Sequence, residues 1–180
     1  MKNKIVTILS AILLVLMPSF RIQAYIVSEE DLPQLAEENF NKASMVFVGR
    51  STSQQISEDN TLTVTTYRVL KNFKNTPGEC VQISHQAQIP RTADAFPVMR
   101  MKVKTVENCQ DQPSQYLTVA LFYIFEDDGK GITYTYMPLN SDNDSQIYTY
   151  EQFVEAVNAN ERSKSTFAPF LAVLERKQKK

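Results

Sequence analysis

The sequence is poor in the residues that most often carry catalysis and metal binding. Its 180 residues include one histidine, two cysteines and four glycines, and no tryptophan. Structural zinc sites take four ligands, mostly of the cysteine and histidine type, and His85 with two cysteines does not supply them. The motifs G-x-S-x-G and H-E-x-x-H are absent, and the four glycines form no phosphate-binding loop. We therefore expect no metal, no cofactor and none of the common hydrolase or nucleotide-binding sites.

The first 24 residues have the order of a secretory signal peptide. Two lysines precede the apolar run Ile5–Met17, and the small residue Ala24 stands before Tyr25. The run is shorter than the roughly 18 to 20 residues that a membrane-spanning helix needs. Because Ile22 occupies the other position that favours a small residue, an uncleaved membrane anchor is the alternative. We expect cleavage before Tyr25, a mature chain of residues 25–180 and a secreted or periplasmic location.

The predicted mature chain is mildly acidic. The whole sequence has 19 lysines and arginines and 20 acids, and the leader holds three of the cations, which leaves 16 against 20 and a formal charge of about −4. Such a chain is not suited to follow a phosphate backbone, so nucleic acid is not an expected partner. The one basic cluster, residues 175–180, is predicted to be a solvated tail that complements a helix dipole. Peripheral contact of this tail with an acidic membrane surface is the alternative.

The two cysteines, Cys80 and Cys109, are expected to form one disulfide. Both lie in the predicted mature chain, and an isolated pair in an oxidising compartment is typically bonded. The bond would close a loop of roughly 30 residues, for which chain entropy gives about 3.5 kcal/mol of stabilisation. That is a large share of the net stability of about 5 to 15 kcal/mol of an ordinary domain.

Apolar residues at helical spacing predict one short helix near the start of the mature chain and two at its end. The first is expected at Glu30–Asn41. Thr149 and Gln152 have the spacing of a capping box before the second helix, in which each side chain satisfies a free backbone donor of the other residue. Pro169 is expected in the first turn of the third helix. The two C-terminal helices are predicted within residues 149–160 and 166–177.

Alternating, β-branched and aromatic segments predict strands between these helices. The apolar run Met45–Val48 ends at Gly49, where we expect a bend or bulge. The pair Asp128–Gly129 is a hairpin signal between the two strands that flank it. The acidic segment 142–144 lacks the other calcium-loop positions and is predicted to be a solvated loop. Strands are predicted within residues 45–49, 60–74, 80–90, 98–109, 114–125 and 132–138.

His85 is the only imidazole from which a catalytic site could be built. The stretch from Val81 to Ile89 alternates with period two, which puts His85 on the apolar face and Ser84 on the opposite one. Adjacent Ser84 therefore does not serve as the nucleophile of a His85 base, although a serine from elsewhere remains open. The pattern favours a structural role for His85 on the inner or half-buried face of a strand.

Two strand segments offer candidate ligand surfaces. Arg100, Lys102 and Lys104 share one face of the segment 98–109, with apolar residues on the other. Such a stripe is ordinarily solvated, and binding of an anion or a partner is the alternative. Tyr134 and Tyr136 share a face of the segment 132–138, where they either pack across strands or form a stacking surface for a ligand.

Four segments in order, NKASMVFVGR, TVTTYRVLKNFK, CVQI and QYLTVALF, resemble the netrin-like OB-fold domains, the family that includes tissue inhibitors of metalloproteinases. The resemblance covers about residues 41–125. It implies a small antiparallel barrel or strongly curved sheet with packed helices, in a secreted binding module. Inhibitors of that family place an N-terminal cysteine on the zinc of the target. Here no cysteine precedes Cys80, so the resemblance transfers no functional residue.

The sequence thus predicts a mainly β domain at 25–180, with a short N-terminal helix and two C-terminal helices. We expect a secreted or periplasmic, non-enzymatic module that binds an unknown protein, glycan or small ligand. A secreted hydrolase that uses His85 is the first alternative. A helix packed on a curved sheet around a ligand pocket, as in cystatin-like or transport-factor-like folds, is the second.

Overall fold

The computed structural model describes residues 29–75, 78–88, 98–107, 109–110, 118–127, 131–139 and 146–179. The predicted signal peptide lies outside these residues, as do the loop at 89–97 and the acidic segment 142–144. The described elements are, in order, the 3-10 turn η1 (Glu29–Asp31), α2 (Leu32–Lys42), β1 (Met45–Ile56), β2 (Leu62–Lys74), β3 (Cys80–Gln88), β4 (Val98–Val106), β5 (Val119–Asp127), β6 (Gly131–Pro138), α3 (Tyr150–Ala159) and α4 (Glu161–Gln178).

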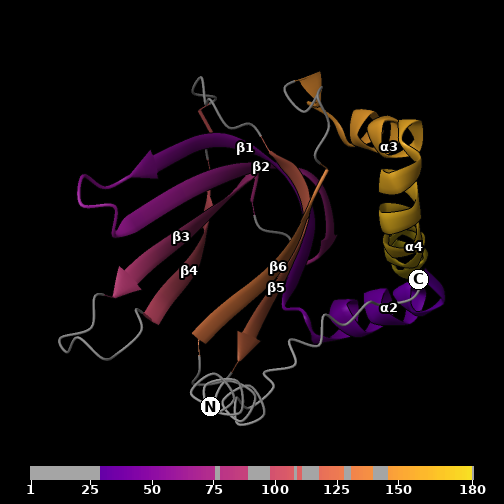
Figure 1. The fold of residues 1–180 in the computed structure, drawn as a ribbon, viewed down its shortest axis with the longest axis horizontal. Helices are drawn as coiled ribbons and strands as arrows, with labels where there is room; N and C mark the ends of the chain where they lie inside the picture. The colour runs from indigo at the N-terminus through magenta and orange to yellow at the C-terminus, as the bar shows by residue number, and fades with distance from the viewer. Residues whose placement is uncertain are drawn as a thin grey trace, which may run out of the picture.

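The six strands form one antiparallel sheet in the order β4-β3-β2-β1-β5-β6. The predicted mainly β architecture with one N-terminal and two C-terminal helices is confirmed, and the β5–β6 hairpin is formed as predicted. Figure 1 shows the sheet as strongly curved, with β1 and β2 bending over the other strands. The Cα atoms of β4 and β6 approach within 8 Å, yet no ladder joins these two strands within the described residues. The sheet is therefore open and curved, and a closed barrel is not formed by this part of the chain.

The central strand β1 is irregular at the predicted position but longer than predicted. It continues through Gly49 to Ile56, and its register with β2 shifts between Val48 and Gly49. A Cβ atom at Gly49 would lie 2.9 Å from the ring of Phe47 and 3.3 Å from the Cβ of Tyr67, closer than real contacts allow without movement. Glycine is therefore needed here for the close approach of β1 and β2, and the shifts in register bend both strands.

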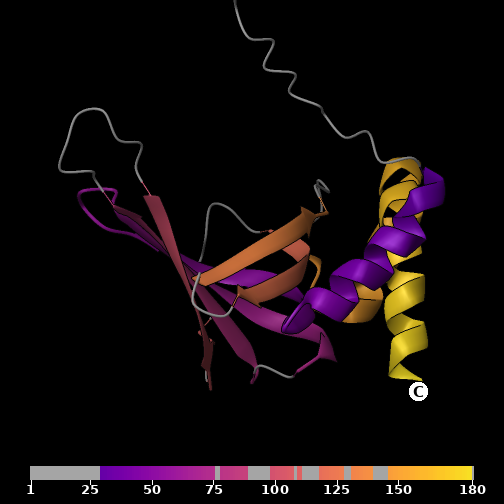
Figure 2. The same cartoon turned by 90° about the horizontal axis from the view of Figure 1, so that it is seen from below.

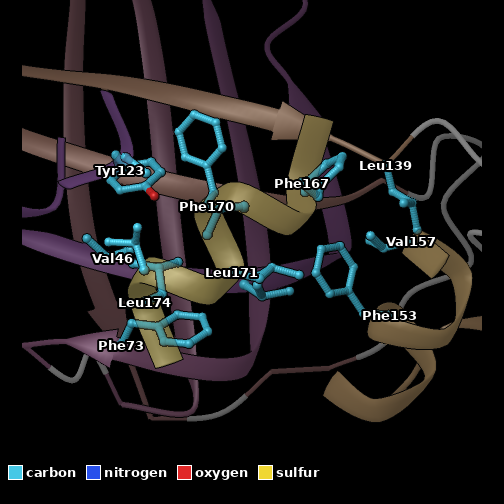
Figure 3. Close-up of a cluster of buried hydrophobic side chains, with 14 of the residues drawn as sticks. Val46, Phe73, Tyr123, Leu139, Phe153, Val157, Phe167, Phe170, Leu171 and Leu174 are labelled. Atoms are coloured by element: carbon cyan, nitrogen blue, oxygen red, sulfur yellow. The ribbon is translucent and has the colours of Figure 1, made fainter. Parts of the chain in front are cut away.

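The three α-helices pack on one face of the sheet, as Figures 1 and 2 show. Their apolar stripes meet the side chains of β1, β5 and the end of β2 in a continuous core (Figure 3). The apolar spacing that predicted the two C-terminal helices thus supplies residues of this core on both of them. The buried members from the helices are Ala36, Phe153, Val157, Phe167, Phe170, Leu171, Val173 and Leu174.

The capping box at α3 is confirmed, whereas α4 begins earlier than predicted. Thr149 Oγ1 accepts from the Gln152 backbone at 3.3 Å, and Gln152 Oε1 accepts from the Thr149 backbone at 3.1 Å. The side chain of Asn160 accepts from two backbone N–H groups in the first turn of α4. Pro169 therefore lies inside α4, and its predicted place in the first turn is wrong. A single residue separates α3 from α4, so the chain turns sharply at this cap.

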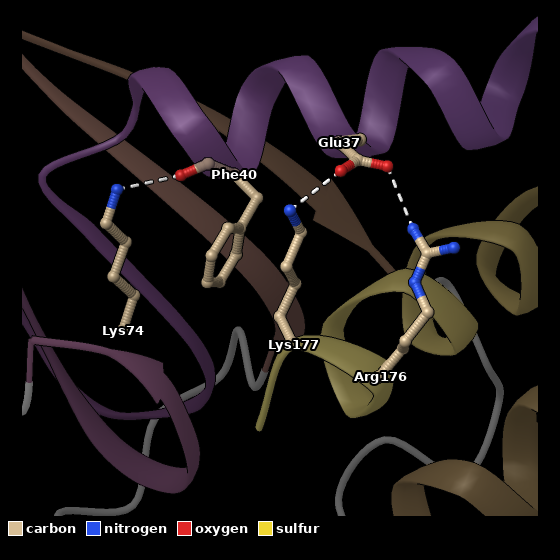
Figure 4. A network of polar contacts seen from close by, with 5 residues as sticks. All are labelled: Glu37, Phe40, Lys74, Arg176 and Lys177. Atoms are coloured by element: carbon tan, nitrogen blue, oxygen red, sulfur yellow. Dashed lines mark hydrogen bonds and ion pairs between the residues drawn. The ribbon is translucent and has the colours of Figure 1, made fainter. Parts of the chain in front are cut away.

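Basic side chains of α4 and β2 hold α2 in place (Figure 4). Arg176 Nη2 and Lys177 Nζ donate to the two carboxylate oxygens of Glu37 at 2.8 and 2.7 Å. The hydrogen bond and charge of Lys177, together with Arg176, lower the pKa of Glu37. Lys74 Nζ donates to the carbonyl of Phe40 at 2.9 Å, at the negative end of the α2 dipole. Two cations of the basic cluster at 175–180 are thus helical and engaged with α2, in contrast to the solvated tail that was predicted.

The predicted disulfide between Cys80 and Cys109 is confirmed, with Cα atoms 5.9 Å apart. Cys80 is fully buried at the start of β3. Cys109 follows β4, so the bond fixes the end of the β3–β4 pair that is remote from the loop at 89–97. Arg68 Nη2 on β2 donates to the carbonyl of Cys109 at 3.3 Å and extends this attachment to a third strand.

Candidate functional site

The face of the sheet opposite the helices, which we call the inner face, is concave. Tyr134 on β6 and His85 on β3 meet across it, with the hydroxyl and Nε2 3.2 Å apart. Three strands lie between β3 and β6 in the sheet. In a flat sheet with neighbours about 4.8 Å apart, these two strands would be roughly 19 Å apart. The contact therefore requires the sheet to curl toward the inner face, and it confirms that His85 lies there with Val81 and Ile83.

Aromatic rings form one wall of the inner face. Phe122 is fully buried at the centre of β5. The ring of Tyr136 stacks with the ring of Phe122, with a centroid distance of 6.0 Å and an interplanar angle of 19°. The ring of Tyr134 stacks with that of Tyr136, with a centroid distance of 5.7 Å and an interplanar angle of 28°. Tyr67 on β2 meets Phe122 edge to face at 4.7 Å. The predicted common face of Tyr134 and Tyr136 is thus confirmed, with 48% of Tyr136 exposed.

These rings border a cleft of about 320 Å³ at the end of the inner face, which we call the inner cleft. Its lining comes from β1, β2, β3 and β6 and from the residue before β5. Every described lining residue except a proline carries a hydroxyl, an amide or an imidazole, and none of these described residues carries a carboxylate, an ammonium or a guanidinium group. The lining residues are Gln54, Thr63, Thr65, Tyr67, His85, Thr118, Tyr134, Tyr136 and Pro138.

Local hydrogen bonds position the polar part of the inner cleft. Thr118 is held to β1 because its backbone N–H donates to Ser51 Oγ at 2.8 Å and its carbonyl accepts from the Ser51 N–H at 2.9 Å. Gln54 Nε2 lies 3.5 Å from Thr65 Oγ1, at the limit of a hydrogen bond. The hydroxyls of Thr63, Thr118 and Tyr136 make no side-chain hydrogen bond within the described part of the chain. These hydroxyls are therefore free to donate to or accept from a ligand.

Burial favours the neutral form of three titratable groups of the inner cleft. Burial lowers the pKa of His85 from its ordinary value of 6.5. Burial, together with the neighbouring Tyr134, raises the pKa of Tyr67 to about 12. Burial also raises the pKa of Tyr134, with a smaller contribution from Tyr136. Desolvation penalises the charged form of each of these three groups, so they offer donors and acceptors in their neutral form.

The described residues that line this cleft include no catalytic partner for His85. No serine, cysteine, aspartate or glutamate is among the described residues that line it. Its Nε2 is paired with the Tyr134 hydroxyl, and the two rings lie 5.4 Å apart. A general base needs a nucleophile within hydrogen-bond reach, and an orienting acid completes a triad. The described residues place neither beside His85.

Lys102 and Lys104, two of the three basic residues predicted as a ligand surface, lie away from the inner cleft. Met101 and Val103 of β4 pack against the inner-face core, so the alternation of the strand places the exposed Lys102 and Lys104 on the opposite face. Arg100 lies on β4 opposite Gln86, and its side chain is outside the described residues. The structure therefore brings Tyr134 and Tyr136 together with His85 and separates the two lysines from them.

Two larger hollows lie on the helical side of the molecule. One, of about 430 Å³, runs between α2 and α4 beside the Glu37–Arg176 ion pair. The other, of about 390 Å³, lies at the junction of α3 and α4 near the Asn160 cap. In both, the polar groups already serve helix docking or capping. The inner cleft is smaller, but the hydroxyls of Thr63, Thr118 and Tyr136 make no side-chain hydrogen bond within the described part of the chain. The ring of Tyr136 is also exposed, so we take the inner cleft as the candidate site.

No match to the chain was found among protein-family models, curated proteins or solved structures. The resemblance to netrin-like domains accordingly stays a prediction. Within the described ranges, no group of three or more histidine, cysteine, aspartate or glutamate residues could hold a metal ion. The helices of the described part are too short or too polar to cross a membrane.

Proposed function

We propose that this protein is a secreted or periplasmic, non-enzymatic binding module that holds a small uncharged ligand in the inner cleft. The observation that carries this proposal is the composition of the lining: aromatic rings on one side and uncharged hydrogen-bonding groups on the other. Ligand pockets typically combine apolar and aromatic walls with a few convergent polar groups, and they start at about 300 Å³. The disulfide supports export, because such bonds persist in oxidising compartments.

A binding role is preferred to the hydrolase alternative because the only imidazole is engaged with a tyrosine. In a hydrolase of the serine type, His85 would face a serine and an acidic residue. In this cleft it faces Tyr134, whose raised pKa keeps the hydroxyl protonated. Tyr134 and His85 therefore form a neutral donor–acceptor pair that is suited to orient a ligand.

The binding role can be tested by NMR titration of the mature protein with a library of small uncharged polar compounds. We expect amide shifts to concentrate on residues of β2, β3 and β6 around the inner cleft, and to vanish in Tyr136→Ala. Tyr148→Ala is the matched control, because Tyr148 is a similarly exposed tyrosine, 57% exposed, that stacks on Arg50 outside the cleft. Shifts that survive in Tyr136→Ala, or that cluster on the helical side, would contradict the proposal.

Two further measurements address the enzyme alternative and the export. Turnover of model ester, peptide or glycoside substrates that is lost in His85→Ala would favour the hydrolase instead.

N-terminal sequencing of the exported protein should give a sequence that begins at Tyr25 if the leader is cleaved as predicted. Recovery of the full-length chain in a membrane fraction would favour the uncleaved anchor.

A further inference from the structure

We infer that the ligand of the inner cleft is a neutral carbohydrate, with one face of a sugar ring against Tyr136. This inference rests on the proposed function, because it assigns a chemical class to the ligand of the same cleft. Three features of the cleft support it: a fixed and exposed aromatic platform, a facing set of uncharged hydroxyl and amide groups, and the absence of charged groups from the described lining.

Tyr136 has the properties of a stacking platform. Almost half of its surface is exposed, while its ring is stacked with Phe122 at 6.0 Å and with Tyr134 at 5.7 Å between centroids. Because Phe122 is fully buried, the ring of Tyr136 is held in place before any ligand binds. A pyranose ring presents a patch of C–H groups on each face, and an aromatic ring that is amphipathic and rigid packs against such a patch at low entropic cost.

The polar side chains across the cleft complement the hydroxyl groups around a sugar ring. A sugar hydroxyl both donates and accepts hydrogen bonds. The same is true of the side chains that face it here, namely threonine and tyrosine hydroxyls, the glutamine amide and a neutral imidazole. Thr63 and Thr118 have hydroxyls without a side-chain partner in the described part of the chain. A planar apolar ligand would cover these groups without satisfying them, which carries a desolvation cost. The polar side of the cleft therefore favours a polyhydroxylated ligand over a purely aromatic one.

The charge of the cleft selects neutral sugars over acidic ones. No lysine or arginine is among the described residues that line it, and burial lowers the pKa of His85, which favours the neutral imidazole. The exposed Lys102 and Lys104 lie on the opposite face of the sheet. A carboxylate or phosphate placed in the cleft would lose water without gaining a cation. The volume of about 320 Å³ is at the small end for ligand sites and fits a mono- or disaccharide rather than a longer chain.

The test is a set of calorimetric and NMR titrations of the mature protein with three kinds of probe. The first kind is neutral mono- and disaccharides, among them glucose, galactose, N-acetylglucosamine and cellobiose. The second is their charged counterparts, glucuronate and glucose 6-phosphate. The third is indole, a flat aromatic compound without hydroxyl groups. We expect at least one neutral sugar to bind, with amide shifts around the cleft and with much weaker binding of its charged counterpart.

Variants of one residue then test the platform. Tyr136→Ala should weaken the binding of that sugar about tenfold or more, as expected when an aromatic stack is removed. Tyr136→Phe should keep most of the affinity, because the ring remains, and Tyr148→Ala should leave it unchanged. Equal loss in Tyr136→Phe and Tyr136→Ala would overturn the stacking role.

The outcomes separate this inference from the function it rests on. Binding of indole in the cleft without binding of any sugar would overturn the carbohydrate assignment and leave the binding module in place. Tighter binding of the charged sugars would likewise overturn the neutral class alone. If no compound of the wider polar library shifts the cleft residues, both proposals fail together.

Discussion

The two faces of the sheet are both apolar at the centre, but different structural elements cover the apolar side chains of each face. On the covered face, side chains of β1 and β5 meet three helices, and the packing extends to the last turn of α4. On the inner face, Phe47, Phe122 and Ile124 pack, within the described part of the chain, with residues of other strands, because the sheet curls over them. This curvature closes the middle of the inner face and leaves its end open as the inner cleft. One sheet thus forms a helix-covered core on one face and an open cleft on the other.

The central strands make this division possible because alternation sends neighbouring residues to opposite faces. Val46 and Val48 enter the covered core, whereas Phe47 enters the inner core between them. Gly49 then leaves room on the inner face for the ring of Phe47. Both faces thus depend on a few consecutive residues of β1, and substitutions can perturb one face at a time.

The largest effect is expected from a cavity in the covered face. Phe153 on α3 is fully buried and meets Phe167 at 5.7 Å. Phe153→Ala should lower the free energy of unfolding by about 3 to 5 kcal/mol, the usual cost of deleting a buried phenylalanine. Urea denaturation of the mature protein measures this loss. Ile56→Ala, at a side chain that is 56% exposed, should change stability by less than about 0.5 kcal/mol. Similar losses in the two variants would contradict the assignment of this core.

An intermediate effect is expected from overpacking the inner face. Gly49→Ala would place a Cβ atom 2.9 Å from the ring of Phe47, and we expect a loss of about 1 to 3 kcal/mol. Gly78→Ala is the matched control, because its Cβ would come no closer than 3.5 Å to the carbonyl of Val106. Thermal and urea denaturation should therefore separate two substitutions that are chemically identical. A neutral Gly49→Ala would show that β1 and β2 can move apart at little cost.

The smallest effect is expected from the protonation of His85. Because burial lowers its folded-state pKa below 6.5, the unfolded chain takes up a proton at a higher pH than the folded protein. The contribution of His85 to stability is therefore complete above the unfolded pKa. It is lost progressively as the pH falls from about 6.5 to the folded pKa.

The single histidine makes this prediction easy to check. Its ring protons give one set of NMR signals, whose titration midpoint should lie below 6.5. The stability difference between the natural protein and His85→Gln should narrow as the pH decreases from about 7.5 to about 5, across the histidine range. A midpoint at or above 6.5 would mean that the imidazole is not desolvated and that the inner cleft is wetter than the structure indicates.

Much of the fold follows from local patterns in the sequence. Period-two alternation placed His85 with Val81 and Ile83, and it placed Tyr134 with Tyr136. The apolar stripes of α3 and α4 could likewise be predicted from the sequence. The start of α4 could not be predicted, because the polar residues around Asn160 resemble a loop in the sequence, and only the capping geometry distinguishes them from one.

The composition of the inner cleft could not be read in the same way. It depends on the curl that brings β6 to β3, and this in turn follows from the long-range pairing of β1 with β5. Gln54 faces the cleft because the β1–β2 register shifts between Ser51 and Ser53, which reverses the alternation of the strand beyond it. Thr63, Thr65 and Tyr67 lie two residues apart on β2 and share the inner face, but nothing local in the sequence says which other strand such a face will meet.

The contact between His85 and Tyr134 also makes the inner cleft an indicator of complete folding. These two residues are 49 positions apart in the chain, and the rest of the described lining comes from β1, β2 and β6 and from the residue before β5. No single hairpin contains the inner cleft, so a fragment or folding intermediate that lacks one of these strands would be unable to form it. Ligand binding would accordingly add a cross-link between distant segments and slow the opening of the sheet.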